Sequence, residues 1–260
     1  MKLGRRPRKF NPRIPHMSAI IGGRQLPPVP PVMDWTAKLP SSLGMMLNDQ
    51  LGCCTCAGIF HALQVWTANA NPPMDTEPDS SVEIAYEKFC GYKPGDPSTD
   101  NGGVEQDVLT DWLNQGVDTA HPLGTPDTIN KLTAFYEVDS RNLDDVRRTI
   151  ADCGVAYIGF NVPAYLMANG NPPDVWCLPQ GAEDESIEGG HCVILCGYDA
   201  DTFKLISWGR VYSMTTGFFQ KFVDEVYGPV DADWVNSQGT TPLGLSLGEL
   251  EAQMGALKIS

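Results

Sequence analysis

The sequence predicts an α+β fold with a helical N-terminal lobe and a C-terminal lobe rich in antiparallel strands. In the first half, apolar residues recur at helical spacing, as at Ile59, Leu63, Trp66 and Ala70, and such a stripe is typical of a buried helix. In the second half, short apolar runs bounded by turn residues replace this pattern and favour strands. A helical part followed by a β-rich part is typical of the α+β class.

Four helices are expected before the C-terminal tail. The apolar stripe predicts a helix over residues 57–70, directly after Cys56. Shorter helices are predicted over 82–89 and 104–114, the second after a run of turn-forming residues. Residues 143–152 carry charged side chains on one side, which predicts an amphipathic helix.

Four strands are expected in the second half. Apolar runs predict strands over 155–160, 191–198 and 203–208, and a further strand is predicted over 217–222. Beyond them, residues 247–257 have the spacing of a short amphipathic helix.

Composition divides the chain into an arm, two lobes and a tail. Residues 1–33 hold seven prolines and seven basic side chains but no acidic one, which predicts an extended basic arm. Residues 34–125 form the predicted helical lobe, 126–227 the β-rich lobe and 228–260 a tail. The two lobes are expected to form one unit, 34–227.

The net charge of −14 limits the partners of the body. Because the arm is basic, the body is strongly acidic, so it is not expected to bind nucleic acid, whereas the arm suits an acidic protein surface or a phosphate backbone. The sequence holds neither an apolar run long enough for a membrane helix nor an apolar secretory signal. These features predict a cytoplasmic protein with reduced cysteines and no membrane contact.

Cysteine, histidine and glutamine side chains are spaced for thiol chemistry. Cys56 lies at the start of a predicted helix, where the helix dipole lowers the pKa of a thiol, and His191 begins a predicted strand. Gln50, six residues before Cys56, is expected to donate its amide to an oxyanion. Cys53 and Cys56 also have the spacing of zinc ligands, but a closed zinc site needs a second matched pair. No metal or cofactor is therefore expected.

The order of these residues resembles that of the papain-like cysteine peptidases. His191 follows Cys56 by 135 residues, and roughly 130–150 residues separate nucleophile and histidine in that family. Further segments in the family's order are Asp34-Trp35, Asn48 to Cys56, Asn101-Gly102-Gly103, His191 to Tyr198 and Ser207-Trp208-Gly209. The resemblance covers about residues 34–222. It implies a divergent member with a cleft between its two lobes.

The resemblance also implies roles for individual side chains. Cys56 is the implied nucleophile, His191 the implied base, and Gln50 the implied oxyanion donor together with the Cys56 backbone N–H. Gly102-Gly103 are implied to pair with the substrate backbone, and Trp208 to line the cleft.

Three positions depart from the family's pattern. Ile206 stands where the family has the asparagine that orients the histidine, so Ser207 or a backbone carbonyl is expected to take that role. Ala57 replaces the tryptophan that follows the nucleophile. Asp100 replaces the cysteine that is bridged to the position of Cys53, so Cys53 is expected to be a free thiol.

The sequence therefore predicts a papain-like thiol peptidase or amide hydrolase with a peptide or protein substrate, and it leaves open whether the site is active. The alternative is a papain-fold structural or assembly protein, for example a phage virion or capsid-associated component, whose arm and tail bind neighbouring subunits. A third interpretation is a module that holds a peptide in the cleft without cutting it.

Overall fold

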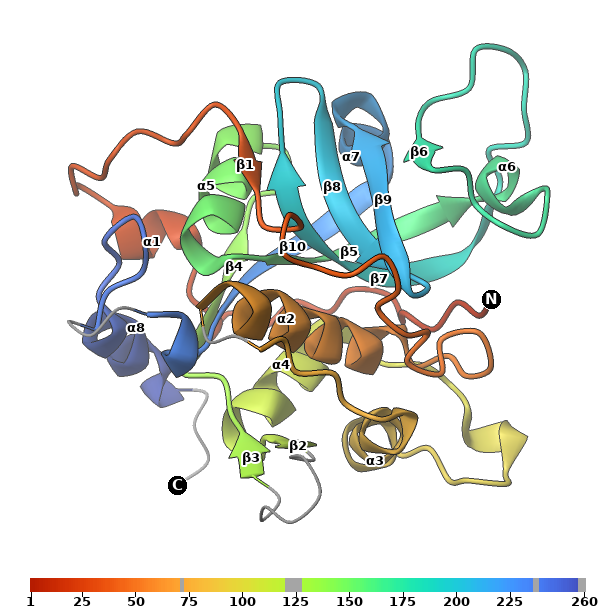
Figure 1. Ribbon diagram of the computed structural model, residues 1–260, viewed down its shortest axis with the longest axis horizontal. Coiled ribbons are helices and arrows are strands. Elements are labelled where there is room, and N and C mark those ends of the chain that lie inside the picture. The colour runs from red at the N-terminus through yellow and green to blue at the C-terminus, as the bar shows by residue number, and fades with distance from the viewer. Residues whose placement is uncertain (71–72, 120–127, 236–238, 257–260) are drawn as a thin grey trace.

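The computed structural model describes residues 1–70, 73–119, 128–235 and 239–256. It has the α+β architecture that the sequence predicts, with a large, mainly antiparallel sheet and a group of helices against it (Figure 1). The helices and 3₁₀ turns are α1 (Met17–Ile21), α2 (Cys54–Ala70), α3 (Asp79–Cys90), η1 (Pro97–Thr99), α4 (Glu105–Asn114), α5 (Leu143–Cys153), α6 (Ala164–Met167), α7 (Thr216–Phe222), η2 (Ala232–Trp234), α8 (Leu247–Gln253) and η3 (Met254–Ala256).

The strands form one large sheet and one small hairpin. They are β1 (Met33–Asp34), β2 (Val117–Thr119), β3 (Thr128–Asn130), β4 (Ala134–Val138), β5 (Ala156–Pro163), β6 (Val175–Trp176), β7 (Ile187–Tyr198), β8 (Thr202–Ser207), β9 (Arg210–Thr215) and β10 (Val223–Val230). The large sheet has the order β4-β10-β5-β7-β8-β9-β6, and β1 adds to β7. The small sheet pairs β2 with β3.

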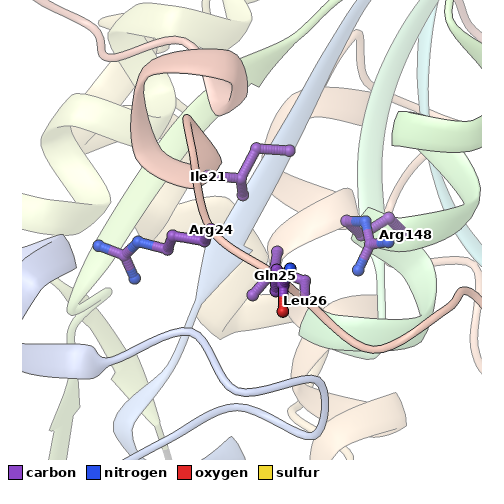
Figure 2. A pocket seen from close by; sticks show the side chains of 5 residues that line it. All are labelled: Ile21, Arg24, Gln25, Leu26 and Arg148. Atoms are coloured by element: carbon purple, nitrogen blue, oxygen red, sulfur yellow. The ribbon is translucent and has the colours of Figure 1, made fainter.

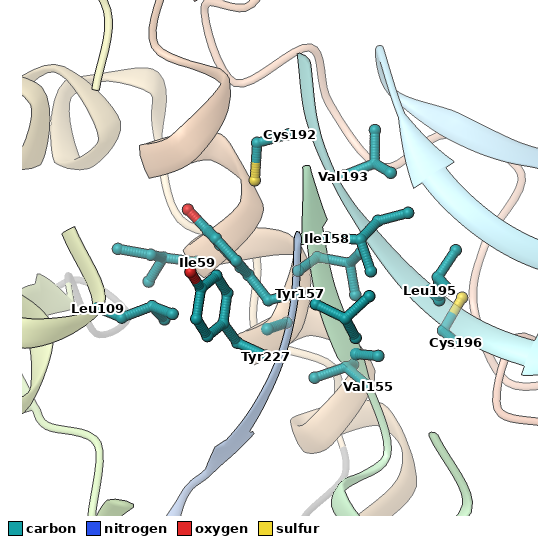
Figure 3. Packing of buried hydrophobic residues seen from close by; sticks show 14 of the residues in the cluster. Ile59, Leu109, Val155, Tyr157, Ile158, Cys192, Val193, Leu195, Cys196 and Tyr227 are labelled. Atoms are coloured by element: carbon teal, nitrogen blue, oxygen red, sulfur yellow. The ribbon is translucent and has the colours of Figure 1, made fainter. Parts of the chain in front are cut away.

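The predicted long helix is confirmed as α2, which packs against β7 at the centre of the molecule (Figure 1). Its side chains are buried on almost every face, so the helix lies between the sheet and the other helices. The close approach depends on Gly58, because a Cβ there would lie 3.0 Å from Tyr157 Cε2 and 3.4 Å from the Cys192 sulfur. Figure 3 shows Ile59 of α2 meeting Tyr157 of β5 in this shared core.

The predicted strand over 217–222 is wrong, because this segment is the helix α7. The Thr215 side chain caps the helix by accepting a hydrogen bond from the backbone N–H of Phe218. Phe218 and Phe222, four residues apart, both bury their rings, which is the spacing of a helix face. The strand that follows, β10, crosses the expected boundary at residue 227 and lies between β4 and β5 in the sheet.

No helix in the described part of the chain is long and apolar enough to cross a membrane.

Candidate active site

The helix α2 begins three residues earlier than the sequence predicts. The Cys53 carbonyl accepts hydrogen bonds from the N–H groups of Cys56 (2.8 Å) and Ala57 (2.9 Å), so Cys53 precedes the first turn and Cys54 is the first helical residue. Cys56 is therefore the third residue of the helix. The backbone N–H groups that an α-helix leaves free at its start belong to Cys54 and Thr55, which places the positive end of the helix dipole there.

The thiols of Cys53 and Cys56 face the interior of the helical lobe. The Cys53 sulfur lies 3.4 Å from the carbonyl oxygen of Met46. The Cys56 thiol hydrogen-bonds with that of Cys90, and this bond, followed by burial, raises the pKa of Cys56 well above its usual value. The nucleophile predicted at Cys56 is thus fully buried in this structure, and its catalytic role stays a prediction.

The Cys54 thiol faces the other lobe. The backbone amide groups of Cys192, on β7, and of Gly4, in the arm, point at the Cys54 sulfur and act to lower its pKa. Burial outweighs them and raises the pKa of Cys54 to about 12. Among the three neighbouring thiols, Cys54 is the one directed at the strand that carries His191, and in this closed arrangement it keeps its proton.

The two candidate oxyanion donors differ in their burial. Gln50, the predicted donor, is exposed to solvent. Asn48 is 3 % exposed, and its Oδ1 has no hydrogen-bond partner among the described residues. Asn48 precedes Cys54 by six residues, as Gln50 precedes Cys56. Asn48 and Cys54 therefore share the six-residue spacing of Gln50 and Cys56, two residues earlier in the sequence.

His191 lies in an aromatic cluster and is fully buried. Its Nε2 is 2.8 Å from Ser207 Oγ, and its ring stacks on Trp208 with centroids 4.3 Å apart and planes 7° apart. The other ring nitrogen, Nδ1, has no hydrogen-bond partner in the described structure. Burial, with a smaller effect of nearby His61, lowers the pKa of His191 to about 3. The imidazole is therefore neutral at neutral pH.

The contact between His191 and Ser207 depends on the hairpin that joins β8 to β9. Ser207 pairs with Arg210, so Trp208 and Gly209 form a two-residue turn with φ angles of 42° and 79°. Positive φ at both turn residues is the geometry that suits such a hairpin, but it is uncommon for a large side chain. The stack on His191 holds Trp208 in this conformation. Ser207 thus occupies the place next to His191 that the sequence analysis considered for it, and its orienting role stays a prediction.

Residues 4–6 of the arm lie between the two lobes, and we call this space the interlobe groove. Arg5 N–H donates to the Gly190 carbonyl (3.0 Å) on one side. On the other side, Arg6 N–H donates to the Gly103 carbonyl and Gly103 N–H donates to the Gly4 carbonyl, both at 2.8 Å. Gly102 and Gly103, predicted to pair with a substrate backbone, are therefore occupied by the chain's own arm.

The Arg5 side chain enters a pocket of carboxylates beside this backbone. It forms ion pairs with Glu105 at the start of α4 and with Asp224 and Glu225 on β10. Burial acts to lower the pKa of Arg5, but the three acids outweigh it and raise the pKa. The arm is thus attached to both lobes by charge as well as by backbone hydrogen bonds.

Asp100 connects the arm to the loop before α2. Its Oδ1 accepts from Gly52 N–H (2.9 Å) and from Tyr86 OH (2.8 Å), and its Oδ2 pairs with Lys2 Nζ (2.5 Å). The sequence places Asp100 where the papain-like peptidases have a bridged cysteine, and it therefore predicts Cys53 as a free thiol. All eight cysteines are described, and each is a free thiol. Hydrogen bonds of Asp100, rather than a disulfide, therefore link its loop to the arm and to the segment before α2.

The structure brings together His191, Ser207 and Trp208, and it places Gly102 and Gly103 beside the arm. It leaves Gln50 at the surface and Cys56 in the helical lobe. Sequence reasoning missed three kinds of residue: the thiol of Cys54, the amide of Asn48, and the arm's Arg5 with its acidic partners. The sequence did carry a signal for Cys54. The pair of Asn48 and Cys54 has the same six-residue spacing as the pair of Gln50 and Cys56.

Other surface features are separate from this site. A hollow of about 420 Å³ is lined by Ile21, Arg24, Gln25, Leu26 and Arg148 (Figure 2). Its two arginines are engaged, Arg24 with Glu249 and Arg148 with the Pro27 carbonyl. Across the described residues, no cluster of three or more His, Cys, Asp or Glu side chains is arranged to hold a metal ion.

Comparison with known proteins identifies the fold. No family model and no curated protein matches this sequence. Among solved structures, xylellain, a cysteine protease from Xylella fastidiosa, superposes with a TM-score of 0.65 at 17 % identity, over 88 % of this chain and 96 % of xylellain. Digestive procathepsin L 3 of Tenebrio molitor gives 0.58 at 14 % identity, over 86 % and 75 %.

A structure of the bromelain protease from Ananas comosus in complex with the E64 inhibitor is also similar, with a TM-score of 0.53 at 15 % identity. It covers 78 % of this chain and 99 % of the bromelain chain. These identities are low, so the similarity establishes the architecture. The chain has the papain-like cysteine protease fold.

Proposed function

We propose that this chain is a papain-like thiol peptidase or amide hydrolase in which Cys54 is the nucleophile and the arm keeps the site closed. The observation that carries the proposal is the position of the Cys54 sulfur. It lies at the start of α2 and faces the backbone amide of Cys192, the residue next to His191. A helix start and a neighbouring imidazole are the two features that activate a thiol.

In the proposed reaction, displacement of the arm lets His191 Nδ1 take the proton from the Cys54 thiol. The thiolate attacks the carbonyl carbon of the scissile amide, and the carbonyl oxygen becomes an oxyanion. The Cys54 backbone N–H and the Asn48 side-chain amide stabilise this oxyanion. The C–N bond then breaks, and the amine leaves with the proton from His191. Water hydrolyses the thioester that remains on Cys54, with His191 as the base.

In the proposed mechanism, the contacts of Gly4 keep the arm from being cut. Its N–H faces the Cys54 sulfur. Its carbonyl instead accepts the hydrogen bond from Gly103. A nucleophile needs the carbonyl carbon, so the arm in this position blocks the thiol without offering a bond to cut. The raised pKa of Cys54 and the lowered pKa of His191 apply to this closed state, in which the arm covers the thiol.

The choice between Cys54 and Cys56 can be tested by alkylation of the full chain. Gly4 has no room for a side chain, because a Cβ there would collide with the Gly52 carbonyl oxygen. Gly4→Ala should therefore displace the arm. We expect iodoacetamide, followed by peptide mass spectrometry, to label Cys54 at least tenfold faster in Gly4→Ala than in the unchanged chain.

Gly248→Ala is the matched control, because a Cβ at Gly248 meets no atom within 4 Å. It should leave the labelling rate unchanged. Faster labelling of Cys56 than of Cys54 in Gly4→Ala would support the original prediction instead. In the Gly4→Ala background, Cys54→Ala should abolish hydrolysis of a casein substrate and Cys56→Ala should not. Retained hydrolysis in Cys54→Ala would refute the proposed nucleophile.

The assembly alternative depends on neighbouring subunits that hold the arm. In this structure the chain's own body holds it, through Lys2 with Asp100, Arg5 with its three acids, and Lys9 with Asp107. These contacts favour the role of the arm in closing the site, so we do not propose the assembly function in parallel.

A further inference from the structure

The pocket that holds Arg5 is built from both lobes. Glu105 comes from the helical lobe, and Glu225 and Asp224 come from β10. Glu225 Oε1 lies 2.6 Å from both Nε and Nη2 of Arg5, and Glu105 Oε1 lies 3.5 Å from Nε. The Arg5 side chain is 1 % exposed, and those of Glu105 and Glu225 are both fully buried. We call these three acids, with Gly159 as the floor, the acidic pocket.

The shape of the acidic pocket suits a guanidinium group. A Cβ at Gly159 would collide with Arg5 Nε and Glu105 Oε1, so the glycine leaves the room that the planar group fills. Several carboxylate oxygens surround the fork of N–H donors, which a guanidinium can satisfy together and an ammonium on a flexible stem cannot. The geometry therefore selects arginine over lysine.

The charge of the pocket requires a cation. The Glu105 carboxylate hydrogen-bonds with the Cys192 thiol, and its counter-charge is the Arg5 guanidinium. Burial, with a contribution from Glu225, raises the pKa of Glu105 well above its usual value, and Arg5 acts in the opposite direction. Two buried carboxylates without a cation are strongly unfavourable. An empty acidic pocket is therefore ready to bind another guanidinium.

The backbone around Arg5 adds no sequence preference. The hydrogen bonds of Gly4, Arg5 and Arg6 to Gly103 and Gly190 involve only main-chain atoms. In recognition of an extended peptide, such bonds supply affinity, and side-chain pockets supply specificity. The acidic pocket beside Cys54 is therefore the part of the groove that can favour one peptide side chain over another.

We propose that the acidic pocket is an arginine-selective subsite of the interlobe groove, filled here by Arg5, and that peptides presenting an arginine are the class of substrate that replaces the arm. The substrate class rests on the peptidase function proposed above. The pocket's selectivity is a binding property and can be measured without hydrolysis.

The test empties the pocket in the full chain with Arg5→Ala and supplies N-ethylguanidinium as the probe. We expect saturable binding by calorimetry, at least tenfold tighter than that of ethylammonium, and a rise in Tm of at least about 3 °C at saturation. The matched control, Arg6→Ala, removes an exposed arginine one residue away, so it should not bind the probe. Equal affinity for the two cations, or binding by the control, would overturn the proposal.

A second variant covers the case in which Arg5→Ala does not fold. Gly4→Ala displaces the arm but leaves every pocket residue in place. We expect it to bind a peptide of residues 1–9 at least tenfold more tightly than the same peptide with Arg5→Leu. Equal affinities, or no binding of either peptide, would overturn the subsite. Selective binding with an inert Cys54 would instead refute only the peptidase function, so the two failures are distinguishable.

Discussion

Arg5 and Glu225 form a buried ion pair that joins the start of the chain to strand β10. The Glu225 carboxylate lies 2.6 Å from the guanidinium, and neither side chain is more than 1 % exposed. The same carboxylate accepts a hydrogen bond from Tyr227 OH at 2.9 Å. This pair anchors a segment that lies across the proposed nucleophile, so the stability of the fold and the closure of the site share one interaction.

Replacing Arg5 should destabilise the protein more at neutral pH than in acid. Arg5→Met leaves Glu105 and Glu225 buried without a cation, which we expect to cost about 3–5 kcal/mol at pH 7. The folded-state pKa values of both acids are raised, so their contribution to stability is present below their unfolded pKa and is lost as pH rises. Without Arg5, more stability is lost as the pH rises. Urea unfolding should therefore show a smaller cost near pH 4.5 than at pH 7.

Lys9→Met is the control for this prediction. Lys9 pairs with Asp107 at 2.6 Å, but both side chains are more than half exposed. Such pairs contribute about 0–1 kcal/mol. A cost for Lys9→Met as large as that of Arg5→Met would show that burial of the pair is not the cause.

His191 should make the protein less stable as pH falls. Its folded-state pKa is about 3, below the 6.5 of an unfolded histidine, so its contribution to stability is present above pH 6.5 and is lost as pH falls toward 3. Between pH 6.5 and pH 5 the expected loss is about 2 kcal/mol for each such histidine. His61, with a pKa of about 4, should behave alike.

The measurement compares the free energy of unfolding at pH 6.5 and pH 5. In His191→Gln the difference between the two pH values should shrink by about 2 kcal/mol, whatever the variant's overall stability. His16→Gln is the control, because the His16 side chain is 47 % exposed. An unchanged pH difference in His191→Gln would mean that the imidazole is not held neutral by burial.

Asn48 and Gln50 should differ in their effect on turnover. In the Gly4→Ala background, Asn48→Ala should lower kcat on casein by about 10²–10³-fold with little change in KM, because an oxyanion donor acts in the transition state. Gln50→Ala should change kcat less than about twofold, since Gln50 is exposed. The reverse ranking would favour the pair of Gln50 and Cys56 and would contradict the proposed pair of Asn48 and Cys54.

The regular elements were predictable because their signals are local. The stripe from Ile59 to Ala70 predicted α2, and the apolar runs predicted β5, β7 and β8, each within a few residues of the bounds observed. The segment 217–222 failed because three phenylalanines suit a strand as well as a helix by composition. The Thr215 cap and the burial of both Phe218 and Phe222 decided for the helix.

The sequence by itself determined the fold class, the order of the elements, and the thiols and histidine near which the chemistry is proposed. It could not determine which thiol faces the second lobe, because cysteines 53, 54 and 56 share one local pattern and differ only in the direction that the first turn of α2 gives them. It also could not pair Arg5 with Glu105 and Glu225, which lie 100 and 220 residues away. Those contacts exist only once the helical lobe and β10 pack together, so only the tertiary structure decided that the basic arm lies in the groove.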